Sequence, residues 1–212
     1  LAGTVYGIYR TANGAARWEK AEGQGYTDPW VFRFATDPVR PQVLYAACLE
    51  GLLKSSDGGR TWAPSDDGIQ GKGGVTDLAI NSQDPRTIYV TLARDFEYIW
   101  RSTDSGATWT PIPISMPEGG VGYESVAIDP SDPDTLYIGV GSAGILKTTD
   151  AGATWTLLKN GLPPFDYSLL YEDLEVDPQS PRTVYAATSV GVYRSADAGA
   201  TQTVVWLHPD CP

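Results

Sequence analysis

Residues 102–109 read Ser-Thr-Asp-Ser-Gly-Ala-Thr-Trp, and this octet decides the fold because it returns along the chain. Residues 55–62 and 148–155 repeat it with Ser or Thr first, Asp third, Gly fifth, Thr seventh and Trp last. Residues 195–202 end in Gln instead of Trp, and residues 11–18 keep the Trp but have Asn in the third place. The third positions are 44, 47, 46 and 47 residues apart. A near-constant period of this length predicts a repeat architecture.

Each residue type in the octet suits a tight hairpin between two strands. The hydroxyl residue is expected to end one strand, and the carboxylate can accept hydrogen bonds from amides of the turn. Glycine allows the positive φ that such turns often need, and Trp begins the next strand and packs inward. We therefore predict structural roles for Asn13, Asp57, Asp104, Asp150, Asp197, Trp18, Trp62, Trp109 and Trp155.

The residues between the octets read as short strands. In one period the segments 75–80, 87–92, 98–102 and 108–112 are rich in β-branched and aromatic residues, which favours strands. A proline that cannot pair in a sheet separates the first two strands of each period, at Pro41, Pro85, Pro133 and Pro181. Four antiparallel strands in each period form the blade of a β-propeller.

The octet resembles the Asp-box, or BNR repeat, over nearly the whole chain. This family includes sialidases, xyloglucan-degrading glycosidases, the sortilin ectodomain and a photosystem II assembly factor. The resemblance implies an all-β protein, a β-propeller of four-stranded antiparallel blades. We expect one domain over residues 1–212, with a partial blade at 1–21 and blades at 29–66, 75–112, 123–158 and 171–206.

The two ends of the chain predict an incomplete ring of about four and a half to five blades. Residues 1–4 align with residues 185–188, the second strand of a blade, so the first blade is expected to lack its innermost strand. Residues 204–212 are expected either to form a fourth strand or to close the first blade. Open blade edges recruit other strands, so association through these edges is a further expectation.

Composition limits the partners. The formal net charge of −11 would repel a phosphate backbone, so we expect no nucleic-acid partner. No apolar run approaches the ~20 residues that span a bilayer, so we expect no membrane insertion. The chain starts with Leu and shows no signal peptide. The resemblance favours an extracellular or cell-envelope location.

Ligands of such propellers usually bind on the face opposite the octet turns. The loops expected there are long and place aromatic side chains beside carboxylates, a combination that suits sugar rings and their hydroxyls. Loops also carry function more often than the strands that position them. The alternative is that Tyr and Trp at the starts of strands pack between blades. The predicted ligand-binding residues are Tyr26, Asp28, Trp30, Tyr98, Tyr123, Glu124, Tyr171 and Glu172.

No catalytic residue is predicted. The arginine triad and Tyr nucleophile of sialidases, and the catalytic aspartates of xyloglucanases, have no matching positions in the chain. Residues 68–74 are rich in Gly but precede a strand, so they do not predict a phosphate loop. Cys48 and Cys211 do not form a CxxC motif, and His208 is the only histidine, so neither a metal nor a cofactor is expected. We expect Cys48 to be a buried free thiol.

These observations leave three functions open. The first, which we favour, is a non-catalytic scaffold or binding module for a carbohydrate or a protein. The second is a fragment of a sialidase-like or xyloglucanase-like glycoside hydrolase, which requires a carboxylate pair across the scissile bond. The third is a protein-interaction propeller similar to sortilin, which requires a large exposed apolar patch.

Overall fold

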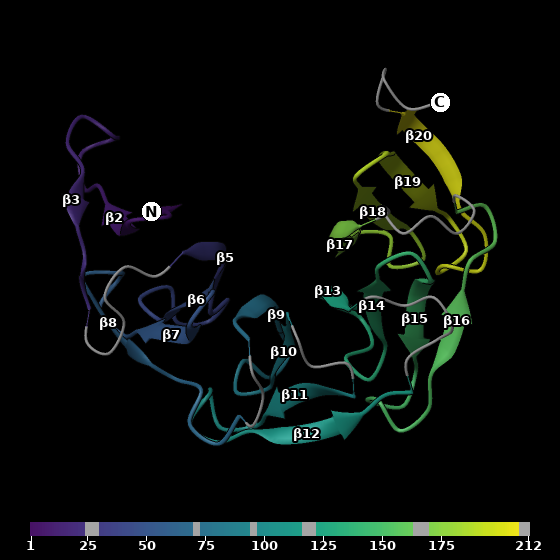
Figure 1. The fold of residues 1–212 in the computed structure, drawn as a ribbon, viewed down its shortest axis with the longest axis horizontal. Coiled ribbons are helices and arrows are strands. Elements are labelled where there is room, and N and C mark those ends of the chain that lie inside the picture. Colours follow the sequence, from purple (N-terminus) through teal and green to yellow (C-terminus); the bar gives the residue numbers. More distant parts are fainter. Residues whose placement is uncertain (24–29, 70–72, 94–96, 116–121, 163–169, 208–212) are drawn as a thin grey trace. The chain divides into compact units, whose positions relative to one another are not determined.

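A computed structural model describes residues 1–23, 30–69, 73–93, 97–115, 122–162 and 170–207 (Figure 1). Within these ranges every regular element is a β-strand, and none is a helix. The predicted all-β class is therefore confirmed. The chain divides into two compact units, one of Leu1–Arg94 with Trp100–Pro111 and one of Asp95–Ile99 with Ile112–Pro212.

The first unit holds three sheets. Its strands are β1 (Ala2–Thr4), β2 (Gly7–Arg10), β3 (Glu19–Lys20), β4 (Glu22–Gly23), β5 (Val31–Thr36), β6 (Leu44–Cys48), β7 (Gly51–Ser55), β8 (Thr61–Pro64), β9 (Val75–Ile80) and β10 (Ile88–Leu92). β11 (Tyr98–Ser102) and β12 (Thr110–Pro113) contribute residues to both units. The sheet orders are β1-β2-β3, β4-β8-β7-β6-β5 and β12-β11-β10-β9.

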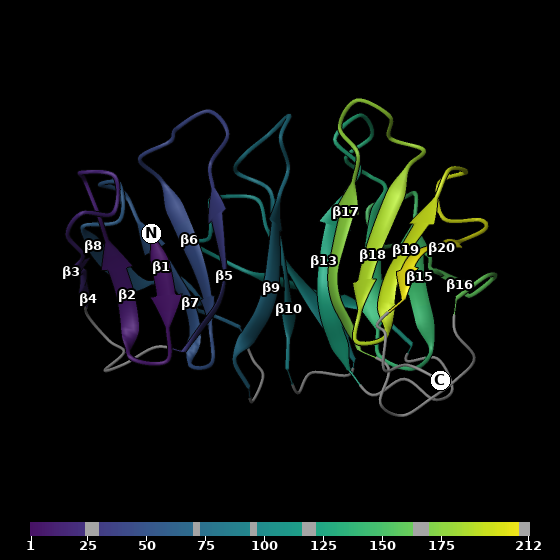
Figure 2. The same ribbon diagram turned by 90° about the horizontal axis from the view of Figure 1, so that it is seen from above.

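The second unit holds two sheets of four strands each. Its strands are β13 (Tyr123–Ile128), β14 (Leu136–Val140), β15 (Gly144–Thr148), β16 (Thr156–Leu158), β17 (Tyr171–Val176), β18 (Val184–Thr188), β19 (Gly191–Ser195) and β20 (Thr203–Leu207). Each sheet follows chain order, and Figure 2 shows β17 to β20 running side by side. The four-stranded antiparallel blade predicted from the repeat is confirmed.

The first sheet and the last strand bear on two expectations, that the first blade lacks its innermost strand and that the end of the chain forms a fourth strand or closes the first blade. β1 and β2 pair with Ala2 opposite Tyr9, and in the described part of the chain β1 has β2 as its one partner strand. β20 pairs with β19 through Arg194 and Thr203, so residues 203–207 form the fourth strand of their own blade. One pairing was not predicted: β4 adds to β8 in parallel, with Glu22 opposite Thr61. Two residues are too few to show a strand pattern in the sequence.

Each octet closes its own hydrogen-bond network. Asp104 Oδ1 accepts the N–H groups of Ala107 at 3.0 Å and Thr108 at 2.8 Å, and Asp104 Oδ2 accepts the Thr108 hydroxyl at 2.5 Å. Ser102 donates its hydroxyl to Asp104 at 2.8 Å and accepts the Gly106 N–H at 2.8 Å. Around Asp57, Asp150 and Asp197 the carboxylate likewise accepts the N–H and the hydroxyl of the Thr four residues on and the hydroxyl of the Ser or Thr two residues before. The predicted carboxylate-to-amide bonds are therefore present.

The turn inside the octet needs two residues with left-handed backbone. Gly106 has φ of 82°, and Ser105 before it has φ of 63°. Ala151 and Ala198 occupy the place of Ser105 with φ of 54° and 60°. Non-glycine residues seldom adopt this region, so the side-chain bonds of the octet hold the backbone there.

The last residue of the octet is buried to different extents in the five copies. Trp62 and Trp109 are buried, and Trp109 Nε1 donates to the Ser65 carbonyl at 2.8 Å. Trp155 is half-buried, less than expected, and Trp18 of the degenerate octet is 43% exposed. Gln202, which replaces Trp, is buried and donates Nε2 to the Gly199 carbonyl at 2.9 Å. It thus supplies the bond that Trp62 Nε1 makes to Gly59 at 3.2 Å.

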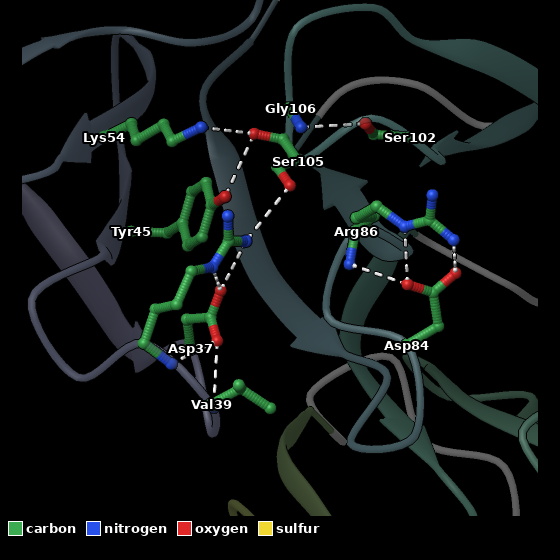
Figure 3. A network of polar contacts seen from close by, with 10 residues as sticks. Asp37, Val39, Tyr45, Lys54, Asp84, Arg86, Ser102, Ser105 and Gly106 are labelled. Atoms are coloured by element: carbon green, nitrogen blue, oxygen red, sulfur yellow. Dashed lines mark hydrogen bonds and ion pairs between the residues drawn. The ribbon is translucent and has the colours of Figure 1, made fainter.

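Neighbouring blades meet through a tyrosine and a lysine. Tyr45 donates its hydroxyl to the Ser105 carbonyl at 2.9 Å, and Lys54 donates to the same oxygen at 2.7 Å (Figure 3). In the second unit Tyr137 and Lys147 hold the Ala198 carbonyl in the same way, at 3.1 and 2.9 Å. Each link joins the second and third strands of one blade to the octet of the next.

Buried apolar residues from several strands form the cores. In the first unit Ile8, Leu44, Leu53 and Trp62 cluster with Cys48. In the second, Tyr137, Tyr171, Leu174 and Tyr193 belong to another cluster. Cys48 is buried and free, as predicted, and burial raises the pKa of its thiol to about 12.

Candidate functional site

The first strand of each four-stranded repeat carries a β-bulge near its beginning. The register with the second strand shifts within the first three residues of β5, β9, β13 and β17. We call this end of each sheet the bulge end. It lies opposite the octet, because the octet joins the third and fourth strands at the other end. The residues that the register skips are Phe32, Thr76, Glu124 and Glu172. Bulges re-aim side chains and are frequent beside functional sites.

An exposed aromatic pair stands at the bulge end of the second sheet. Trp30 and Phe32 stack with their ring centroids 6.3 Å apart and their planes at 29°. Trp30 is 50% exposed and Phe32 is 45% exposed. Leu49, also exposed, donates its backbone N–H to the Trp30 carbonyl at 2.9 Å. We call the exposed apolar side chains of Trp30, Phe32 and Leu49 the Trp30 platform.

An ion pair links β5, the strand that carries Phe32 of the Trp30 platform, to the next sheet. Arg33 Nε is 2.9 Å from Asp77 Oδ1, which joins β5 to β9. The Asp77 side chain is 3% exposed and that of Arg33 is 30% exposed. Asp77 also accepts the N–H of Leu78 at 2.7 Å. A buried carboxylate is costly unless it is compensated, so Arg33 balances Asp77 and ties two blades together.

The structure places most of the predicted ligand-binding residues at the bulge end. Tyr26 and Asp28 lie outside the described residues. The others occupy the first or second position of a strand or directly precede one: Trp30, Tyr98, Tyr123, Glu124, Tyr171 and Glu172. β13 and β17, which carry four of them, lie against each other. The sequence therefore located these positions at one end of their sheets, while their ligand binding stays a prediction.

Tyr171 and Glu172 differ sharply in exposure. Tyr171 is fully buried in the core of the second unit, whereas Glu172 is exposed. A Cβ on Gly139 would lie 2.5 Å from the Cβ of Tyr171, so β14 approaches this side chain closely. Packing between blades, the alternative left open by the sequence, describes the position of Tyr171.

Two members of the Trp30 platform were not predicted from the sequence. Phe32 and Leu49 were assigned to no site, although a signal existed. Residues 30–34 read Trp-Val-Phe-Arg-Phe, which is more apolar than an alternating strand with one buried face requires. Val31 and Phe34 pack on the core, and the excess apolar residues remain on the surface.

The surface has two further features, a cavity beside one octet and an exposed apolar edge strand. A cavity of about 490 Å³ is lined by Glu22, Gly23, Lys54, Ser56, Thr61, Trp62 and Ala63, beside the octet of the second sheet. On the outermost strand β20, Val204, Val205, Trp206 and Leu207 are all exposed. Such an edge is suited to pairing with another strand, and association through blade edges stays a prediction.

Within the described ranges, no group of three or more His, Cys, Asp and Glu side chains is arranged to hold a metal ion. The same ranges contain no helix that is long and apolar enough to cross a membrane.

Comparison with curated proteins finds xyloglucanases. The chain is 31% identical to a xyloglucanase from Paenibacillus sp in an alignment 219 positions long, which covers 85% of the chain and 21% of the relative. It is 29% identical to the xyloglucanase Xgh74A of Acetivibrio thermocellus, with 84% of the chain and 26% of the relative covered. The chain therefore spans about a fifth to a quarter of the length of these relatives. No protein-family model matches it.

Comparison with solved structures supports the propeller fold. An ancestral GH74 enzyme matches with a TM-score of 0.76 and 18% identity, over 96% of this chain and 29% of that one. The GH74 enzyme of Niastella koreensis matches with a TM-score of 0.70 and 24% identity, over 95% and 34%. The extracellular domain of a two-component system from B. thetaiotaomicron matches with a TM-score of 0.71 and 17% identity, over 98% and 26%. At these identities the likeness shows the fold alone.

Proposed function

We propose that this chain is a propeller segment of a glycoside hydrolase of the xyloglucanase type, and that it provides a polysaccharide-binding surface. The observation that carries the proposal is the 31% identity to the Paenibacillus xyloglucanase over 85% of the chain. Of the functions expected from the sequence, the comparisons support this second one better than a non-catalytic scaffold.

The bulge end supports a role in binding. Exposed aromatic rings offer apolar faces to the C–H faces of sugars, and ligand sites combine such faces with a few polar groups. The Trp30 platform and the exposed Glu172 supply both kinds of group in their respective units.

Bond cleavage is not assigned to this chain. Glycosidic hydrolysis commonly uses one carboxylic acid that protonates the leaving group and a second carboxylate on the other side of the bond. Asp77 is buried at the bulge end and forms an ion pair with Arg33, and in this proposal it has a structural role. The chain therefore binds and orients the polymer in this proposal.

An extracellular location belongs to the same proposal. A polysaccharide too large to enter a cell must be met outside it, and one structural neighbour is an extracellular domain. For these reasons the proposal keeps the extracellular location that the resemblance suggested.

The experiment is affinity electrophoresis of the 212-residue chain in gels that contain xyloglucan, combined with an assay for released reducing ends. We expect retardation by xyloglucan without release of reducing ends. An absence of retardation would contradict the proposal. Turnover that Glu172→Gln abolishes would contradict the assignment of binding without cleavage.

A further inference from the structure

The Trp30 platform is exposed although its own strand also supplies the core. Val31 and Phe34 of β5 pack against the core cluster, and the Phe34 ring lies 5.9 Å from that of Trp62. The bulge in β5 places Phe32 outside this pattern, and Phe32 stacks on Trp30 instead. Single exposed apolar side chains are ordinary, whereas adjoining ones indicate an interaction surface.

The backbone beneath the platform is held on two sides. Leu49 donates to the Trp30 carbonyl at 2.9 Å, and Val31 pairs with Cys48 in the register of β5 and β6. On the other side, a Cβ on Gly74 would collide with the Cys48 carbonyl and with the backbone of Leu49. The backbone just before β9 therefore packs directly against residues 48 and 49. A surface with fixed backbone needs less ordering when a ligand binds.

The charges around the platform favour a neutral ligand. Arg33, the cation on the same strand, is already balanced by the buried Asp77. The chain as a whole carries a formal charge of −11. The negative charge of the chain would repel a uronic-acid polymer or an acidic peptide, whereas an uncharged sugar would meet no such repulsion.

We infer that the Trp30–Phe32 pair is a stacking subsite for a neutral polysaccharide, in which the C–H faces of the sugar rings lie on the two aromatic rings. This inference rests on the proposed function, because it names where on this chain the polymer binds. The chemical class is a neutral glucan of the xyloglucan kind.

The test compares Trp30→Ala and Phe32→Ala with a matched control. Trp206 on β20 is 52% exposed, close to the 50% of Trp30, so Trp206→Ala removes an equally exposed indole elsewhere. Binding of the 212-residue chain to xyloglucan and to polygalacturonate is measured by affinity electrophoresis. We expect Trp30→Ala and Phe32→Ala to weaken xyloglucan binding by roughly tenfold each, the scale of one lost stacking contact.

Trp206→Ala should leave xyloglucan binding unchanged, and Trp30→Phe should restore most of what Trp30→Ala loses. Thermal melts of all variants exclude loss of folding as the cause. If the wild-type chain binds xyloglucan and neither Trp30→Ala nor Phe32→Ala weakens it, the subsite is wrong while the proposed function stands. If the chain binds no xyloglucan, the proposed function itself is wrong. Tighter binding of polygalacturonate than of xyloglucan would overturn the neutral class.

Discussion

The hydroxyl of Tyr45 donates to the carbonyl of Ser105, 60 residues further along the chain, at 2.9 Å. Tyr45 is fully buried, and burial raises the pKa of its phenol to about 12, so it remains a donor at any physiological pH. Ser105 has left-handed backbone inside the octet of the next blade. The bond therefore couples the core of one blade to the octet turn of its neighbour.

Tyr45→Phe should lower the free energy of unfolding by about 1 kcal/mol, because it removes one buried hydrogen bond and keeps the ring. Lys54 still holds the Ser105 carbonyl at 2.7 Å, which keeps the loss small. Urea unfolding measures the change. Tyr6→Phe is the control, since Tyr6 is exposed; equal effects of the two substitutions would refute the role of the Tyr45 hydroxyl.

Trp109→Ala should cost about 3–5 kcal/mol, the range for deleting a large aromatic side chain from a core. Trp109 is buried and donates to the Ser65 carbonyl at 2.8 Å. Trp18→Ala should cost far less, because Trp18 is exposed. A melting temperature that Trp109→Ala leaves unchanged would show that this residue does not hold its hairpin in the blade.

Acid should destabilise the protein through its octets. Hydrogen bonds, first of all from the Thr108 side chain, lower the pKa of Asp104 to about 2 from the ordinary 3.8. Hydrogen bonds also lower the pKa values of Asp150 and Asp197 to about 2. A folded pKa below the unfolded one means that the stabilisation is complete above about pH 4 and is lost as the pH falls towards 2. Asp104→Asn should flatten this dependence in melts between pH 2 and 6; an unchanged slope would contradict it.

Gly139→Ala should destabilise the second unit by about 1–3 kcal/mol, the cost of overpacking a filled core. The added Cβ would lie 2.5 Å from the Cβ of Tyr171, which is fully buried and cannot retreat. Gly23→Ala is the matched control, because nothing lies within 4 Å of a Cβ there. Chemical unfolding of both variants checks the difference, and equal stabilities would argue against close packing at Gly139.

Cys48 should resist alkylation in the native protein. The thiolate is the reactive form, and burial holds the pKa of the Cys48 thiol at about 12. In a Cys211→Ser variant at pH 8, iodoacetamide should label the chain in urea but not in native buffer. Labelling of the native variant at the rate of an exposed thiol would show that this core opens readily.

The repeat predicted the blades well because its signals are local. The expected strands at 75–80 and 98–102 appear as β9 and β11 with the same bounds, and the octet bonds lie within eight residues. What the sequence could not show depends on neighbours in space. Tyr171 reads like any aromatic residue at a strand start, and its burial depends on the core cluster around it and on the close approach of Gly139. Phe32 is exposed because a bulge in β5 shifts the register, and register is not visible in composition.

The octets also bear on how the chain reaches its native state. All the polar bonds around Asp104 connect residues 102 to 108, so a hairpin needs almost no long-range contact to form. Contacts of low sequence separation form fast, and repeats that each close locally can nucleate at several places. The bond from Tyr45 to Ser105 joins two hairpins, so we expect it to form after them. Mutations in an octet should slow folding, whereas loss of the Tyr45 hydroxyl should mainly speed unfolding.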